Sequence, residues 1–214
     1  MAIPAIYRKN LTKAAANYDW IDISNGAGYA TFYLCNSQAG YFLTPETLYS
    51  ELVVWKSAAL GIVADVKIFD DTFTTTLNSP RTVNGTVFAD IAGRAPNNPS
   101  GKTSSLYFIV KFIKISEGTE TILGQATSPT GTWTTGVDNH NQYFLVSIPI
   151  VNELIRKGDK VGIRLEAYSW FITGGETCYT LIGLDPRNRT SVISGENTLT
   201  QTSSTLDIPF RIDI

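Results

Sequence analysis

Short runs in which apolar and polar residues alternate dominate the sequence and predict β-strands. The clearest is KVGIRLEAYSWF at Lys160–Phe171, and VADVKIF at Val63–Phe69 and SLYFIVKFIKIS at Ser105–Ser116 are similar. A period of two places the apolar side chains on one face of a strand. Turn signals such as Asn25–Gly28 and Gly174-Gly175 separate the runs. About nine or ten strands spaced in this way, with little helix, predict an all-β antiparallel sandwich.

Only one segment has the pattern of a short helix. Pro45–Lys56 (PETLYSELVVWK) has Thr44 at the capping position and Glu46 in the first turn, which favours one short amphipathic helix. Val151–Lys157 is compatible with a single helical turn. Two stretches without apolar period, Ala92–Ser104 and Pro129–Asn141, are long enough to be functional loops.

The first seventeen residues differ from the remainder of the chain. Residues 2–17 contain Arg8, Lys9 and Lys13 and no acidic side chain. We therefore divide the chain into an N-terminal arm, residues 1–17, and one sandwich domain, residues 18–214. The three cations are candidate contacts to a neighbouring subunit, and a frayed terminus without a role is the alternative.

Composition excludes several classes of protein. The chain has 214 residues, of which 43% are hydrophobic and 17% charged, with a net charge of −2. Such a chain can fold around a core, and it lacks the basic field that attracts nucleic acid. The longest apolar run, Leu106–Ile115, contains two lysines and is too short to cross a bilayer, and Met1–Lys9 lacks the pattern of a secretory signal. We expect neither nucleic acid nor membrane as a partner.

Residues with catalytic or metal-binding chemistry are few. The one histidine, His140, lies among turn-forming residues, and no Gly-x-Ser-x-Gly elbow is present. Cys35 and Cys178 have no further cysteine or histidine at zinc-ligand spacing; they are either buried thiols or one disulfide. We therefore assign no catalytic residue, no metal ligand and no cofactor.

Some chemical alternatives stay open. Trp133 and Trp170 have polar neighbours and would be the stacking residues of a carbohydrate-binding module. Carboxylates such as Glu166 would be needed by a glycan-degrading enzyme. Asp70-Asp71 is an oxygen-rich pair of the kind that binds calcium.

Parts of the sequence resemble known jelly-roll proteins. The segment VNELIRKGDKVGIRLEAYSW, Val151–Trp170, resembles the turn and late strand of jelly-roll sandwiches of the tumour-necrosis-factor and complement-head type. The start MAIPAIYRKN, the segment YDWIDISNGAGYATFY and the end LDIPFRIDI are similar in style to virion proteins of tailed phages and environmental viruses. These resemblances imply a single-domain, jelly-roll-like antiparallel β-sandwich and a capsid decoration, vertex or head-fibre protein.

The sequence thus leads to one expected function and two alternatives. We expect a non-catalytic viral structural protein located in the virion, which binds capsid or other virion proteins and forms a homo-oligomer, a trimer being favoured. The alternatives are a lectin-like module and a jelly-roll major capsid subunit.

Overall fold

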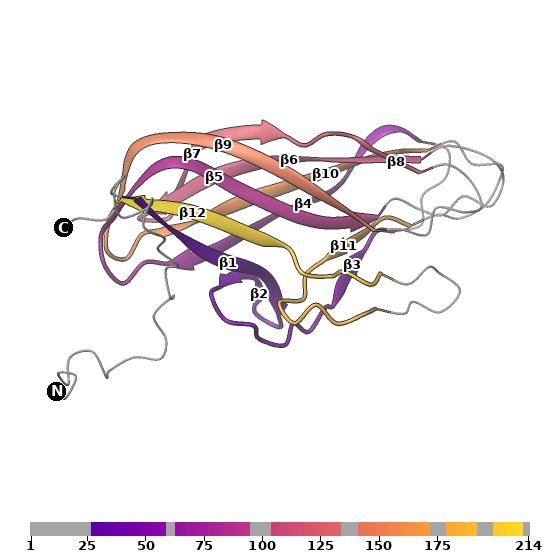
Figure 1. Cartoon of the computed structure of the whole chain (residues 1–214), viewed down its shortest axis with the longest axis horizontal. Coiled ribbons are helices and arrows are strands. Elements are labelled where there is room, and N and C mark those ends of the chain that lie inside the picture. The colour runs from indigo at the N-terminus through magenta and orange to yellow at the C-terminus, as the bar shows by residue number, and fades with distance from the viewer. Residues whose placement is uncertain are drawn as a thin grey trace.

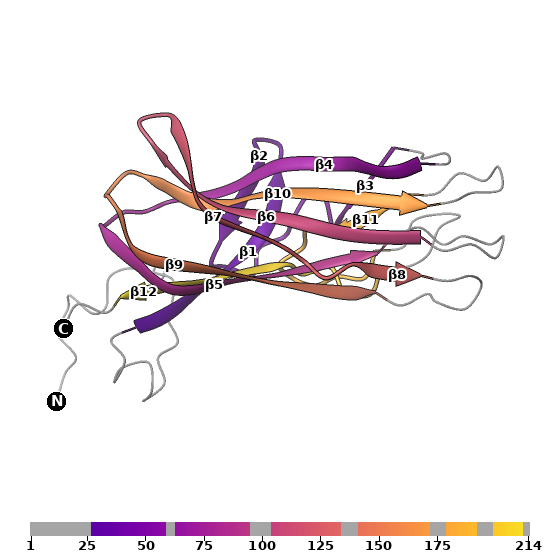
Figure 2. The same cartoon turned by 90° about the horizontal axis from the view of Figure 1, so that it is seen from above.

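The computed structural model describes residues 27–58, 63–94, 104–133, 141–171, 179–191 and 199–211. These residues form two antiparallel β-sheets and contain no helix, and so no helix that is long enough to span a membrane. Seen from above, the two sheets lie as two layers (Figure 2). The all-β sandwich expected from the sequence is confirmed.

The first sheet contains seven strands. They are β1 (Ala27–Ser37), β2 (Gly40–Thr44), β3 (Val54–Lys56), β5 (Arg81–Arg94), β9 (Gln142–Ile155), β11 (Leu181–Gly183) and β12 (Thr205–Arg211). They lie in the order β2-β1-β12-β5-β11-β3, and β9 pairs with the other side of β5 (Figure 1). The long strands β1, β12, β5 and β9 therefore form the body of this sheet.

The second sheet contains five strands. They are β4 (Val63–Thr76), β6 (Ser104–Ser116), β7 (Thr119–Thr127), β8 (Gly131–Trp133) and β10 (Lys160–Phe171), in the order β4-β10-β6-β7 with β8 paired to β6. Successive long strands alternate between the two sheets along the chain: β4, β6 and β10 lie in the second sheet, and β5, β9 and β12 lie in the first. Strand β7 follows β6 within the second sheet. The segments that connect them therefore pass repeatedly between the two layers.

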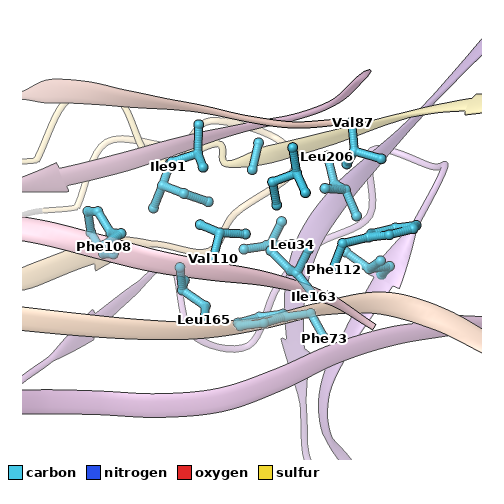
Figure 3. Close-up of a cluster of buried hydrophobic side chains, with 14 of the residues drawn as sticks. Leu34, Phe73, Val87, Ile91, Phe108, Val110, Phe112, Ile163, Leu165 and Leu206 are labelled. Atoms are coloured by element: carbon cyan, nitrogen blue, oxygen red, sulfur yellow. The ribbon is translucent and has the colours of Figure 1, made fainter. Parts of the chain in front are cut away.

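Alternation along the long strands builds the core between the sheets. In β9, residues 143–150 alternate exposed and buried without a break. Figure 3 shows apolar side chains from β1, β4, β5, β6, β10 and β12 meeting in the interior. Phe73, Phe108 and Leu165 are fully buried there. This burial, at about 25 cal/mol per Å² of apolar surface, is the main favourable term in the folding of the sandwich.

The helix expected at Pro45–Lys56 is wrong. Residues 45–53 form turns and irregular chain, and Val54–Lys56 is strand β3, paired with Leu181–Gly183 of β11. The β-branched and aromatic residues at positions 53–55 suit a strand that has a partner, and this pairing outweighs the helical spacing. The helical turn expected at Val151–Lys157 is also wrong, because β9 continues to Ile155 and a turn follows at residues 157–158.

A single glycine allows β10 and β4 to approach closely. A Cβ atom at Gly162 would lie 1.9 Å from the carbonyl oxygen of Phe73. No side-chain rotation relieves a clash with backbone, so any other residue at this position forces the two strands apart.

We predict that Gly162→Ala destabilises the sandwich by about 3 kcal/mol or more, as expected for overpacking against rigid backbone. Urea denaturation followed by tryptophan fluorescence measures the loss. The control is Thr76→Ala, an exposed position on β4 in the same strand pair, which we expect to be almost neutral. Equal stability of the two variants would contradict the prediction.

Candidate functional site

The two tryptophans that the sequence singled out as sugar-stacking residues do not lie on a common exposed surface. Trp133 lies in β8 at 3% exposure, and its ring centroid is 6.2 Å from that of Phe144. It is therefore part of the core, and its ring faces are not available to a sugar. Trp170 is half-buried near the end of β10. The two residues do not form a common exposed platform, and Arg8, Lys9 and Lys13 lie outside the described residues.

Most of the residues considered for chemistry are also apart from one another, but Asp70 and Glu166 share Lys67 as an ion-pair partner. His140 and Cys178 lie outside the described residues, and Cys35 is a buried free thiol whose pKa is raised by burial. Asp70 forms ion pairs with Lys67 and Arg164. Within the described residues, no three histidine, cysteine, aspartate or glutamate side chains form a group that could hold a metal ion.

A network of charged side chains covers the outer face of the second sheet. Glu166 on β10 lies at its centre, with a side chain only 6% exposed, and its Oε1 is 2.6 Å from Lys111 Nζ on β6. Lys67 on β4 lies 3.7 Å from the same oxygen. Arg164 donates to both carboxylate oxygens of Asp70, at 2.7 and 3.0 Å. We call this set the ionic face.

Side-chain pairing keeps the carboxylates of the ionic face charged. Burial opposes ionisation of Glu166, but hydrogen bonds from Lys111 and Tyr168 and the nearby cations outweigh burial and lower its pKa. The guanidinium of Arg164 holds the pKa of Asp70 well below its usual range. Neither carboxylate is suited to act as a general acid or base near neutral pH.

Two tyrosines extend the ionic face. The rings of Tyr107 and Tyr168 stack with centroids 5.2 Å apart and planes only 6° apart. The Tyr107 hydroxyl donates to Asp65 and the Tyr168 hydroxyl to Glu166. Burial and the bond to Asp65 raise the pKa of Tyr107 to about 12. Both phenols thus remain neutral donors, and each donates its hydrogen bond to a carboxylate on the same face.

The outer face of the first sheet is different. Tyr33, Thr205, Asp90 and Leu145 form one row across β1, β12, β5 and β9, and Thr31, Asp207, Phe88 and Ser147 form the next. Leu145 is 59% exposed, and Tyr143 next to this row is 40% exposed. We call these two rows together with Tyr143 the acidic–apolar face.

One carboxylate oxygen on the acidic–apolar face has no partner. Asp90 Oδ1 is buried and accepts no hydrogen bond. Burial, followed by the charge of Asp207, raises the pKa of Asp90. Asp207 accepts a bond of 2.6 Å from Thr31, and no lysine or arginine of the described residues pairs with either carboxylate. A buried polar atom without a partner is uncommon and marks a place where a ligand or partner can bind.

A third cluster ties irregular segments together at the end of the sandwich near β3. Asp185 has no exposed side-chain surface and accepts bonds from Arg189 Nε at 2.9 Å, Arg189 Nη2 at 3.0 Å and the backbone nitrogen of Arg189 at 2.8 Å. Arg189 also donates to the Ser50 carbonyl at 2.7 Å. The guanidinium carbon of Arg187 lies 4.0 Å from the ring centre of Tyr49. This cluster fixes the conformation of segments 47–50 and 185–189.

No family model and no curated protein matches the chain. Among solved structures, an α-amino acid ester hydrolase shares the fold with a TM-score of 0.51 and 10% identity, over 85% of this chain and 36% of that chain. A CocE/NonD family hydrolase from Staphylococcus aureus matches with a TM-score of 0.49 and 12% identity, over 87% of this chain and 37% of that chain. Infectious bursal disease virus, Gx strain, matches with a TM-score of only 0.32 at 13% identity, over 87% of this chain and 37% of that chain.

These comparisons correct the function expected from the sequence. The expectation of a non-catalytic viral structural protein, with its lectin and capsid alternatives, is wrong, because a solved structure that shares the fold with a TM-score of 0.51 is a hydrolase. The virus structure is too dissimilar to support an argument. At 10% identity the likeness shows the fold alone, and this chain spans little more than a third of the hydrolase's length. The expected homo-oligomer, the virion location and the absence of nucleic acid and membrane partners stay predictions.

We predict that Glu166→Gln destabilises the protein by about 2 kcal/mol at pH 7, since it removes the charge that Lys111 and Lys67 face. The pKa of Glu166 is lower in the folded state than its ordinary value of 4.5, so the contribution is complete above that value and fades as pH falls through the folded pKa. Urea denaturation at pH 7 and pH 3 measures both effects. Glu120→Gln, a 32% exposed carboxylate in the same network, is the control and is expected to change little. A loss that is equal at both pH values would contradict the electrostatic origin.

We predict that Asp185→Ala costs about 3 kcal/mol, because it leaves Arg189 and buried backbone donors without their acceptor. Asp65→Ala, which removes an exposed carboxylate with one hydrogen bond, is the matched control. Hydrogen exchange should also show that segments 47–50 and 185–189 lose protection in the Asp185 variant while β6 and β10 keep theirs. Uniform loss across both sheets would contradict the local role of the cluster.

Proposed function

We propose that this chain is a jelly-roll module of a hydrolase that cleaves ester or amide bonds, and that it works beside a separate catalytic unit. The observation that carries the proposal is the shared fold with the α-amino acid ester hydrolase, which spans 85% of this chain and 36% of the hydrolase. The larger part of that enzyme thus lies beyond the shared fold. A module of this kind binds and positions its neighbours.

The strand order supports the jelly-roll assignment. The four long strands β1, β12, β5 and β9 face β4, β10, β6 and β7, and chain segments cross between the sheets at most connections. This is the arrangement of two interleaved Greek keys. In such sandwiches the interior is filled by side chains, so binding takes place on an outer face, an edge or a loop.

The chemistry of the described residues supports a separate catalytic unit. Acyl transfer through a serine or thiol nucleophile needs a base held within hydrogen-bond reach. None of the described residues is a histidine, and the thiol of Cys35 is buried with a raised pKa. The carboxylates of the ionic face are occupied by lysine and arginine. The described sandwich therefore supplies rigid surfaces, and the nucleophile belongs to another part of the assembly.

The test is hydrolysis of amino acid methyl esters by two preparations. One is the recombinant 214-residue chain, and the other is the assembly isolated natively through a tag on this chain, with the tag alone as control. We expect turnover in the native assembly and none with the recombinant chain. Turnover by the recombinant chain would contradict a separate catalytic unit, and its absence from both preparations would contradict the hydrolase assignment.

A further inference from the structure

The acidic–apolar face has the features of a surface that another segment covers. It combines the exposed side chains of Leu145 and Tyr143 with the ring of Phe88 and two carboxylates, Asp90 and Asp207. The ring centroids of Phe88 and Tyr29 are 6.1 Å apart although β12 lies between their strands. The two rings thus approach each other over β12.

The two carboxylates of this face favour a segment that carries positive charge. Asp90 Oδ1 is buried without a hydrogen-bond partner, and among the described residues the Thr31 hydroxyl is the one side-chain donor to Asp207. Asp90 as a whole is only partly buried, but a charged carboxylate with one buried oxygen that lacks a partner is costly, and a cation beside the group recovers part of that cost. An occupant that fits must therefore be apolar and must carry lysine or arginine.

The N-terminal arm, residues 1–17, has this composition. It carries cations and no acidic residue, and its apolar side chains include two isoleucines, a leucine, a proline and a tyrosine. The cations are Arg8, Lys9 and Lys13, and the named apolar residues are Ile3, Pro4, Ile6, Tyr7 and Leu11. The arm thus matches the acidic–apolar face in both charge and hydrophobicity.

The arm is also long enough to reach the face of its own chain. Strand β1 begins at Ala27, and Tyr33, six residues further, lies in the row that contains Asp90. Six residues of strand and two strand spacings place Asp90 about 22 Å from Ala27. The nine residues from 18 to 26 span at most about 30 Å when extended. Attachment to the same chain gives the arm an effective concentration of about millimolar or more, which favours its own face over that of another copy.

We propose that the N-terminal arm, residues 1–17, binds the acidic–apolar face of its own sandwich, with Arg8, Lys9 or Lys13 against Asp90 and Asp207. The apolar side chains of the arm cover Phe88, Tyr143 and Leu145. This contact does not depend on the proposed hydrolase function, and it gives the arm a binding site within the molecule.

Zero-length carbodiimide cross-linking of the full chain tests the proposal. The reagent activates a carboxylate, and attack by a lysine Nζ forms an amide with loss of the activating group as its urea. We expect peptides that join Lys9 or Lys13 to Asp90 or Asp207, in a product with the mass of one chain. The same cross-link in a product of two-chain mass would overturn the assignment to the arm's own sandwich.

A second measurement, the heteronuclear NOE, does not require a lysine to lie close enough to an aspartate to react with it. Heteronuclear NOE values of the backbone amides in residues 5–15 should equal those of the strands in the full chain. The double variant Asp90→Asn/Asp207→Asn, or salt near 1 M where charges are screened beyond about 3 Å, should lower these values. The double variant also lacks the two carboxylates that the carbodiimide activates, so it serves as the negative control that confirms which residues the cross-link joins.

The matched control is Asp65→Asn/Glu120→Gln, which removes the same charge from the outer face of the other sheet. We expect it to leave both readouts unchanged. Low NOE values for residues 5–15 in the unmodified chain would overturn the proposal, as would equal effects of the two double variants.

Discussion

The fold depends on the side chains that fill the space between its two sheets. Each long strand turns alternate residues inward, so a shift of one residue in any strand would place its apolar side chains in water and its polar ones in the core. Phe112, Leu165 and Ile91 come from different strands and are all fully buried. The core therefore fixes the register of these long strands, and this also fixes which of their side chains appear on the two outer faces.

The two outer faces differ in whether their carboxylates are paired with cations. On the ionic face, carboxylates and cations alternate across β4, β10 and β6, and Glu166 at the centre is bonded by Lys111 and Tyr168. The acidic–apolar face has carboxylates without cations and exposed apolar side chains beside them. On the ionic face, Glu166 and Asp70 are paired with cations of the described residues. The acidic–apolar face gains stability when a cationic, apolar segment binds it.

The sequence predicts the strands well because the alternation is local and strong. Lys160–Phe171 was expected as a strand and is β10 with the same bounds. The helix expected at residues 45–56 failed because its β-forming end finds a strand partner, β11, that is more than a hundred residues away. Trp133 looked like a loop residue because its neighbours are polar, yet the pairing of β8 with β6 turns it into the core. Contacts between distant segments decide both cases, and a local pattern does not contain them.

The same limit applies to function. Glu166 and Asp70 stand out in the sequence only as single carboxylates, and nothing local links them to Lys111. Only the registers β10–β4 and β10–β6 bring the three residues together. Asp90 and Asp207 lie far apart in the chain, and the pairing of β12 with β5 places them on one face. The basic character of the arm, in contrast, is visible in the sequence alone. Its match to the two aspartates follows only when the strand order is known, because a charge pattern predicts a partner's sign but the fold determines where the opposite charge lies.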